Sequence, residues 1–229
     1  MRLDKLLSQL KFGSRKDIKA FLKLHEVTID QKRVLIPSIE VDPSSQVIRI
    51  DQEALFYKEQ IHLAIYKPKG YLSANQDALY PCVVELIQSP YHRFDFKIAG
   101  RLDLDAEGLM VLTTNGQFVH EITHPKSHVP KTYEVILDKP FQHHQQLIDG
   151  VVVKDGHQET YTAKAIEITS MDTVVTIVID EGKFHQVKRM FQSVGYDVVN
   201  LKRMKIGQLD LGNLTPGEYK EIRREDLYD

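Results

Sequence analysis

The stretch Gly100–Gly116, GRLDLDAEGLMVLTTNG, decides how this sequence is interpreted. It places three carboxylates, Asp103, Asp105 and Glu107, just before the strand-like run Leu109–Leu112. By composition alone the stretch is an acidic loop between two strands, which is the commoner use of such residues. It becomes a candidate for chemistry only in combination with motifs elsewhere in the chain.

The N-terminal segment predicts a small module of helices and short strands. A leucine stripe at helical spacing from Leu3 to Leu10 predicts a first helix, and Ser14 can cap a second. Val27–Ile29 and Val34–Ile36 flank a polar turn, which is typical of a hairpin. We therefore expect a first domain over residues 1–51, followed by a polar linker over 52–60.

The remainder, residues 61–229, predicts a larger domain dominated by strands. Several consecutive strands with few helices between them indicate an antiparallel or mixed sheet, and so an α+β fold. The expected strands are 61–66, 96–100, 109–114, 131–137, 160–168, 173–180, 197–206 and 218–222, and the expected helices are 82–88, 116–124, 141–149 and 184–195.

Bulk composition narrows the class of protein. The single cysteine, Cys82, excludes an internal disulfide, and no apolar run approaches the roughly 18 residues of a membrane span. We expect a soluble cytoplasmic protein that does not bind a membrane. No GxGxxG or GxxxxGK[ST] loop occurs in the sequence, so we expect no nucleotide cofactor.

A net charge of −2 conceals two basic segments. Residues 1–36 hold nine Lys and Arg side chains against four acids, and residues 183–205 hold six against one. Basic clusters of this kind suit a phosphate backbone, although a solvated face would have the same composition. On the predicted second helix, Arg15, Lys16, Lys19 and Lys23 would lie largely on the outer side, a position for binding and not for catalysis.

The segment His120–His124, HEITH, matches the zinc-peptidase pattern of two histidines one helical turn apart with a glutamate between them. Pro125 would end that helix at once, and no third histidine follows at the spacing of the larger zinc-protease pattern. We therefore expect no metal, and place these histidines on the surface or against phosphate.

Other stretches carry a family resemblance when they are taken together with GRLDLDAEGLMVLTTNG. They are Lys67–Gly70 (KPKG), Lys131–Val135 (KTYEV), Glu181–Phe191 (EGKFHQVKRMF) and Leu214–Tyr219 (LTPGEY). In this order they resemble the ribosomal small-subunit pseudouridine synthases and their large-subunit sisters. RLDKLL, followed by SRKDIKAFLK and a hairpin, resembles the αL-type RNA-binding module of a ribosomal small-subunit protein (S-four-like). The resemblance covers nearly the whole chain.

The resemblance implies a cofactor-free isomerisation of uridine to pseudouridine in ribosomal RNA, with the base flipped into the site. By position in the motif, Asp103 would be the nucleophile, which leaves Asp105 and Glu107 as supporting acids. Tyr133 would stack on the uracil and serve proton transfer. Lys188 would pair with the nucleophile, with Arg189 as the alternative partner.

Further binding residues follow from the same resemblance. Leu201 would pack beneath the base, and Arg101 would contact the target phosphate or occupy the space of the flipped nucleotide. Lys183 and His185 would contribute to substrate binding. In the N-terminal module, the expected RNA contacts are Arg2, Arg15, Lys16, Lys19 and Lys23.

The wording HQVKRMF and the compact length favour small-subunit (16S) ribosomal RNA as the substrate, met within an assembly intermediate by a monomeric enzyme. Two alternatives stay within RNA biology, a large-subunit enzyme of the same superfamily and an RNA-binding assembly factor without catalysis. The zinc peptidase is a third alternative, and it belongs to a different class.

Overall fold

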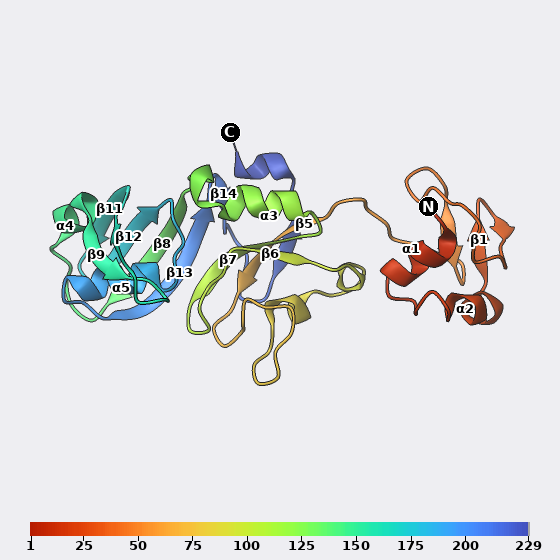
Figure 1. The fold of residues 1–229 in the computed structure, drawn as a ribbon, viewed down its shortest axis with the longest axis horizontal. Helices are drawn as coiled ribbons and strands as arrows, with labels where there is room; N and C mark the ends of the chain where they lie inside the picture. The colour runs from red at the N-terminus through yellow and green to blue at the C-terminus, as the bar shows by residue number, and fades with distance from the viewer. Residues whose placement is uncertain (229) are drawn as a thin grey trace. The chain divides into compact units, whose positions relative to one another are not determined.

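The computed structural model describes residues 1–228 and divides the chain into two compact units (Figure 1). The first unit comprises Met1–Ile61 together with Ile87–Asp95, and the second comprises His62–Leu86 and the chain from Phe96 onward. The sequence assigned all of residues 61–229 to the second domain. Ile87–Asp95 joins the first unit because Arg93 lies 4.0 Å from the ring centre of Phe12 and Asp95 pairs with a lysine of the N-terminal segment.

The first unit contains helices α1 (Leu3–Gln9) and α2 (Ile18–Leu24), with a sheet in the order β2-β1-β3-β4. Its strands are β1 (Val27–Ile29), β2 (Lys32–Arg33), β3 (Ile48–Ile50) and β4 (Glu53–Ala54). The leucine stripe of α1 packs on Ile18, Leu22 and the inward residues of these strands.

Three local predictions in this unit were wrong. Ser14 does not cap α2: its N–H and hydroxyl donate to the carboxylate of Asp17, three residues later, and the helix begins at Ile18. The second hairpin strand comes directly after the turn, at β2, because the turn takes only Asp30 and Gln31, both at positive φ. β4 lies inside the stretch expected to be a linker.

The second unit is built on one large mixed sheet in the order β11-β12-β8-β13-β7-β5-β15, with β14 beside β13 and β6 beside β7. β9 and β10 form a separate ladder. The strands are β5 (His62–Lys67), β6 (Lys97–Ala99), β7 (Glu107–Thr113), β8 (Lys131–Leu137), β9 (Val151–Lys154), β10 (Thr160–Ala163), β11 (Glu167–Met171), β12 (Val174–Ile179), β13 (Val198–Ile206), β14 (Leu209–Asp210) and β15 (Tyr219–Glu221).

The helices of this unit are α3 (Gly116–Thr123), α4 (His144–Asp149) and α5 (Gln186–Ser193), and short 3₁₀ turns cover Val83–Leu86, Pro125–Ser127 and Arg224–Leu227. The predicted helix 82–88 is one such turn. The predicted strand 160–168 is divided, because Ala165 and Ile166 donate to Leu147 and to Val178. β9 was not predicted.

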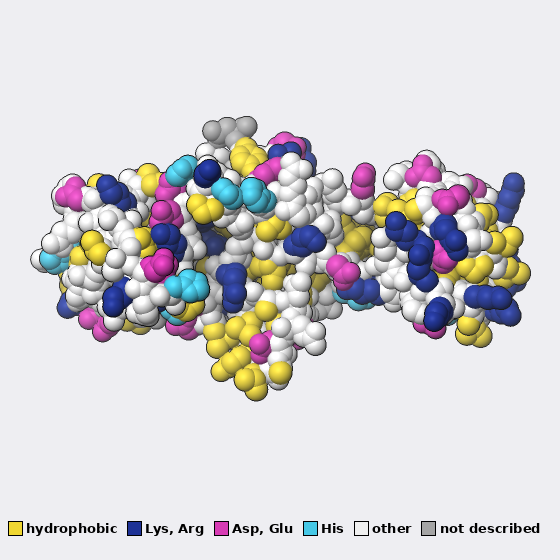
Figure 2. Space-filling model, in the orientation of Figure 1, with side chains coloured by type: hydrophobic (Ala, Val, Ile, Leu, Met, Phe, Trp, Pro, Cys, Tyr) yellow, Lys and Arg dark blue, Asp and Glu magenta, His cyan; other side chains and the backbone are white. Residues whose placement is uncertain are grey.

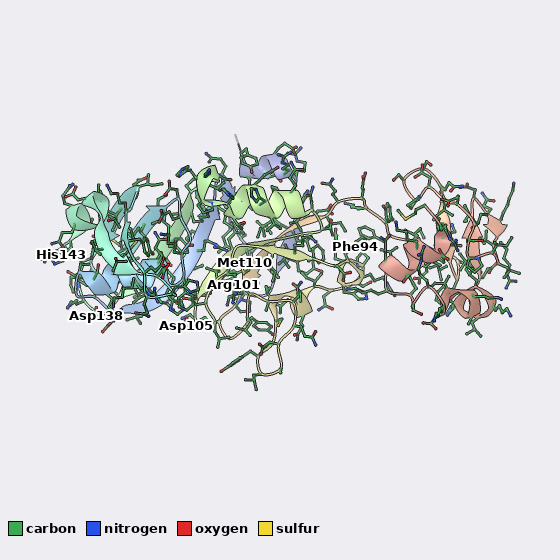
Figure 3. The ribbon with its side chains drawn as sticks, viewed as in Figure 1. Phe94, Arg101, Asp105, Met110, Asp138 and His143 are labelled. Carbon is green, nitrogen blue, oxygen red and sulfur yellow. The ribbon has the colours of Figure 1, made fainter. Side chains whose placement is uncertain are left out.

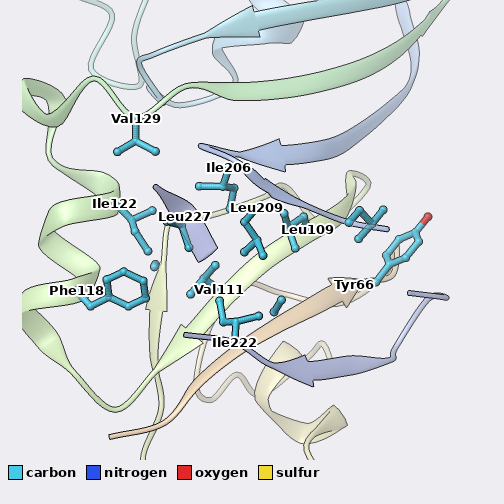
Figure 4. Packing of buried hydrophobic residues seen from close by; sticks show 13 residues of the cluster. Tyr66, Leu109, Val111, Phe118, Ile122, Val129, Ile206, Leu209, Ile222 and Leu227 are labelled. Carbon is cyan, nitrogen blue, oxygen red and sulfur yellow. The ribbon is translucent and has the colours of Figure 1, made fainter. Parts of the chain in front are cut away.

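The mixed sheet changes direction where β13 runs parallel to β7, and all its other pairings are antiparallel within residues 1–228. Gly108, at φ +113°, allows this junction, because a Cβ there would overlap the backbone of Arg203. Figure 4 shows the core beside it, where Phe118 and Ile122 of α3 pack against Leu109 and Val111 of β7. The predicted α+β fold with an antiparallel or mixed sheet is confirmed.

Every helix within residues 1–228 is too short or too polar to span a bilayer.

Candidate active site

The acidic stretch forms the loop between β6 and β7, and the loop is fastened to the segment before it. The Ser73 hydroxyl donates to the carbonyl of Leu102 (2.8 Å) and accepts from the N–H of the same residue (2.9 Å). The N–H of Gly70 donates to the carbonyl of Leu104 (2.8 Å). The KPKG turn and the residues after it therefore hold the backbone on both sides of Asp103.

Helix α5 and the residue before it supply nitrogen groups that contact this loop. Lys188 Nζ lies 3.1 Å from Asp103 Oδ2 and 2.6 Å from Asp105 Oδ1. Nε2 of His185 lies 3.2 Å from the other oxygen of Asp103. Asp103 and Lys188 are both about one-quarter exposed, whereas Asp105 is three-quarters exposed. Figure 3 labels Asp105 and Arg101 on this loop.

The shared lysine favours the charged form of Asp105. The hydrogen bond from Lys188 is the largest cause that keeps the pKa of Asp105 below its usual value. Burial lowers the pKa of Lys188, but the bonds to Asp105 and Asp103 outweigh it, so that pKa is raised. A lysine between two carboxylates stays protonated and orients the less exposed one toward the pocket.

Glu107, the third acid, belongs to a different group of side chains. It accepts hydrogen bonds from the Tyr66 hydroxyl (2.6 Å) and from the amide of Asn200 (3.2 Å). Burial would raise the pKa of Glu107, but these bonds outweigh it and the pKa is lowered. Glu107 thus joins β5, β7 and β13 by hydrogen bonds.

Asp103 opens onto a pocket of about 190 Å³, room for one pyrimidine ring. Tyr133 of β8 and Leu201 of β13 line it, and both are less than one-tenth exposed. Lys188 is not part of the lining, but its partner Asp103 and His185 are. The structure therefore brings together Asp103, Tyr133, Leu201 and His185 at one cavity, with Lys188 directly behind Asp103.

The remaining predicted residues of this unit lie at the edge of the site or outside it. Arg101 is exposed at the rim of the pocket. The ammonium of Lys183, another lining residue, lies 3.5 Å from the ring centre of Tyr161. Arg189 donates to the carbonyl of Lys154 and faces Phe184, so Lys188 is the cation that contacts Asp103.

Three buried cations near Asp103 were not singled out from the sequence. Lys67 is fully buried and donates to the carbonyl of Pro68, and burial lowers its pKa to about 8 despite nearby Asp103. Lys131 and Arg203 are buried in the pocket wall. The sequence did contain a signal for the burial of Lys131. In the alternating strand KTYEVIL, Lys131 occupies one of the positions that point inward.

The basic residues of the N-terminal module divide into two groups. Arg2 and Arg15 pair with the buried carboxylate of Asp4, at 2.7 and 3.5 Å. Lys16, Lys19 and Lys23 are exposed, and no acid within residues 1–228 pairs with them. Figure 2 shows Lys and Arg side chains gathered over this unit. These three lysines are therefore available to an external anion.

The HEITH segment forms the second half of α3 and its C-cap, His124, and its residues have other contacts. The rings of His120 and His124 lie 4.5 Å apart, and Glu121 pairs with Arg224 at 2.8 Å. Across residues 1–228 no group of three or more His, Cys, Asp or Glu side chains is arranged to hold a metal ion.

Comparisons with known proteins give the same picture as the motifs. Residues 61–193 match the RNA pseudouridylate synthase family, and residues 1–47 match the S4 domain. The chain is 44% identical to YtzG of Bacillus subtilis, an uncharacterized RNA pseudouridine synthase, over 100% of this chain and 97% of the relative. It is 34% identical to ribosomal small subunit pseudouridine synthase A of Escherichia coli, over 99% and 98%.

Among solved structures, a pseudouridylate synthase crystal structure superposes with a TM-score of 0.67 at 32% identity, covering 99% of this chain and 98% of the other. The agreement extends over both units, and the loop that carries Asp103 lies within the matched residues 61–193. The protein is a member of the RNA pseudouridylate synthase family, with an S4 domain at its N-terminus.

Proposed function

We propose that the enzyme converts one uridine of small-subunit ribosomal RNA to pseudouridine, with Asp103 as the nucleophile. The observation that supports this most is the pairing of Asp103 with Lys188 and His185 at the mouth of a pocket lined by Tyr133 and Leu201. Relatives named ribosomal small subunit pseudouridine synthase A, in Escherichia coli and Yersinia pestis, support the choice of RNA.

In this proposal the target base leaves its stack and enters the pocket between Tyr133 and Leu201. A pocket of this size accepts one base and no duplex, so the nucleotide has to be extruded from structured RNA. Lys188 pairs with Asp103 and keeps it aimed, which a carboxylate nucleophile requires. Arg101, exposed at the rim, contacts the phosphate of the flipped nucleotide.

The chemistry is an isomerisation. The Asp103 carboxylate bonds to the ribose C1′ as the bond from C1′ to the uracil N1 breaks, and the electron pair of the broken bond leaves with the ring. The ring turns, and C5 bonds to C1′ as the bond from C1′ to the carboxylate oxygen breaks, which frees Asp103 again. The proton on C5 is then removed, a step that we assign to the Tyr133 hydroxyl, and N1 gains a proton.

The N-terminal unit supplies binding energy that does not depend on the identity of the base. Lys16, Lys19 and Lys23 contact phosphates, and exposed cations of this kind give affinity that falls as salt rises. We place the enzyme in the cytoplasm, acting as a monomer on an assembling small subunit, since that is where its RNA would be accessible.

The test is release of tritium from uracil C5 in labelled small-subunit RNA, free and in partly assembled particles. Wild type should release tritium and Asp103→Asn should not, while both bind the RNA within a few fold of each other. Turnover by Asp103→Asn would remove the nucleophile assignment. Tritium release only from large-subunit RNA would mean that large-subunit RNA is the substrate. A wild-type protein that is inactive on both RNAs would indicate an RNA-binding factor without catalysis.

A further inference from the structure

The deepest charged group of the pocket is Arg203 on β13, which is 3% exposed. Its Nε donates to the carbonyl of Leu109 at 2.7 Å, and this bond fixes the guanidinium beside β7. Nη2 is buried and has no hydrogen-bond partner within residues 1–228. A buried guanidinium nitrogen without an acceptor is costly, and such a group in a substrate pocket indicates an absent ligand atom.

Lys131 on β8 is a second cation of the pocket wall. It is 8% exposed and lines the pocket, and its ammonium makes no hydrogen bond or ion pair within residues 1–228. The acids of the pocket have other partners. Asp103 pairs with Lys188, Asp180 contacts His128 at 2.7 Å, and Glu181 accepts from Gln186 at 3.3 Å.

The strand register places both cations next to Tyr133. Arg203 lies directly opposite Tyr133 in the ladder between β13 and β8, and Lys131 is two residues before Tyr133 on the same face. Leu201 lies two residues before Arg203 on the facing strand. A ring held between Tyr133 and Leu201 therefore has Arg203 and Lys131 near its edge.

We infer that Lys131 and Arg203 form a subsite for the carbonyl oxygens of the uracil ring, and that they hold the negative charge of the ring once the glycosidic bond has broken. This inference rests on the proposed function, since it takes this pocket as the place where uracil is detached. The pair would act on the detached ring, whereas Lys188 and His185 act on the carboxylate.

The charge balance of the reaction gives these cations their role. When the bond from C1′ to N1 breaks, its electron pair enters the ring and is shared by N1, O2 and O4. Donors fixed beforehand in a dry site stabilise such an anion without reorganising. As C5 bonds to C1′ and loses its proton, N1 gains one and the ring is neutral again.

The lowered pKa of Lys131 is consistent with a site that binds an anion. The pKa of Lys131 is lowered to about 8: burial is the largest cause, Arg203 adds to it, and Asp180, just after β12, opposes it. An anionic ring in the pocket would raise that pKa and keep the ammonium charged. The empty pocket thus contains a positive charge that the intermediate would neutralise.

A phosphate is the competing ligand for two cations, and the burial of this pair argues against it. The backbone of the RNA stays at the surface when a base is flipped, and the exposed Arg101 at the rim can reach it. Arg203, buried in the sheet, is available to the extruded base alone.

The test compares Lys131→Met with wild type under single turnover, with enzyme saturating over tritium-labelled small-subunit RNA. Methionine keeps the volume of the side chain and removes the charge. The expected result is a rate about 100-fold lower, the size expected for the loss of one charge-stabilising donor. RNA affinity and its salt dependence should be unchanged. Lys164→Met, at an exposed lysine between β10 and β11, is the matched control.

Each outcome has a distinct meaning. Weaker RNA binding with a salt slope reduced by about one would assign Lys131 to a phosphate and overturn the inference. A wild-type rate in Lys131→Met would overturn it as well. Partial recovery in Lys131→Arg, which restores the charge, supports it. An inert wild type would instead refute the proposed function, so the two failures are distinguishable.

Arg203→Gln provides a second measurement, provided that thermal melting shows a folded protein. It should slow turnover at least as much as Lys131→Met, because it removes the guanidinium nearest to Tyr133. A folded Arg203→Gln variant with full activity would contradict the inference even if the lysine variant were impaired.

Discussion

The two units of the protein use positive charge in opposite ways. In the N-terminal unit, Lys16, Lys19 and Lys23 extend into water, where salt screens them. In the second unit, Lys131 and Arg203 are buried in the pocket wall, where a charge interacts strongly with whatever enters the site. Exposed cations can bind any RNA, while buried ones act only on what enters the pocket.

The contrast extends to how each unit treats its acids. In the first unit, Asp4 forms ion pairs with Arg2 and Arg15. This leaves fewer cations for RNA than the sequence suggested. In the second unit Lys188 contacts two carboxylates while the pocket cations remain unpaired. Binding and chemistry should therefore respond separately to substitution.

Lys188→Met should have the largest effect on the reaction rate. It tests whether binding and chemistry respond separately to substitution. Loss of the cation leaves Asp103 beside Asp105 without its main counter-charge, so single-turnover rates should fall about 100- to 1,000-fold. RNA affinity, measured by filter binding, should stay within a few fold. A variant that binds poorly and reacts normally once bound would show that Lys188 belongs to the binding cations instead.

Tyr133→Phe tests whether proton transfer and base stacking can be separated within the pocket. It removes the hydroxyl assigned to proton transfer and keeps the ring assigned to stacking, so turnover should fall about 100-fold with affinity unchanged. Tritium release and binding are measured on the same preparation. Full activity would reduce Tyr133 to a packing residue.

Replacing Lys16, Lys19 and Lys23 together with Gln tests the other side of the comparison. RNA affinity should weaken about tenfold at moderate salt, and the slope of log affinity against log salt should fall by about two to three. The rate at saturating enzyme should not change. An unchanged slope would mean that the second unit makes the phosphate contacts.

Lys131→Met should also increase the stability of the protein, and the size of the increase depends on pH. The native pKa of Lys131 is about 8, against 10.5 for an ordinary lysine. Between these values the unfolded chain holds more protons than the native one, so wild-type stability rises with pH relative to the variant. The variant should be more stable by about 2 kcal/mol at pH 7.

Urea unfolding of both proteins from pH 7 to pH 10 measures this difference. Lys67 has the same shift in both proteins and cancels from the comparison. The advantage of Lys131→Met should narrow as pH rises above 8. A difference that stays constant across that range would mean that the lysine is charged in both states.

The sequence predicted those parts of the fold whose signal is local. β8 alternates inward and outward residues along its whole length and was placed correctly. β9 was missed because its valines alternate weakly, with Val152 69% exposed, and it pairs in a ladder separate from the main sheet. The predicted Ser14 cap was wrong because the Ser14 hydroxyl donates a hydrogen bond to the Asp17 carboxylate.

The candidate site was predictable through motifs and not through chemistry. Motif positions named Asp103, Tyr133, Lys188 and Leu201, and the fold brings them to one place. The unpaired state of Arg203 had no sequence signal, because it depends on β13 lying parallel to β7 and on a glycine at position 108. Charges buried by tertiary packing are visible only once the strands are ordered.

The two hydrogen bonds between Ser73 and Leu102, and the one from Gly70 to Leu104, determine when this loop becomes ordered. A loop that is tied on both sides of its reactive residue loses its conformational entropy when the chain folds, and not again at each catalytic cycle. The amide of Leu102 should therefore exchange with deuterium as slowly in the free protein as in the RNA complex. Ser73→Ala should speed that exchange before any RNA is added.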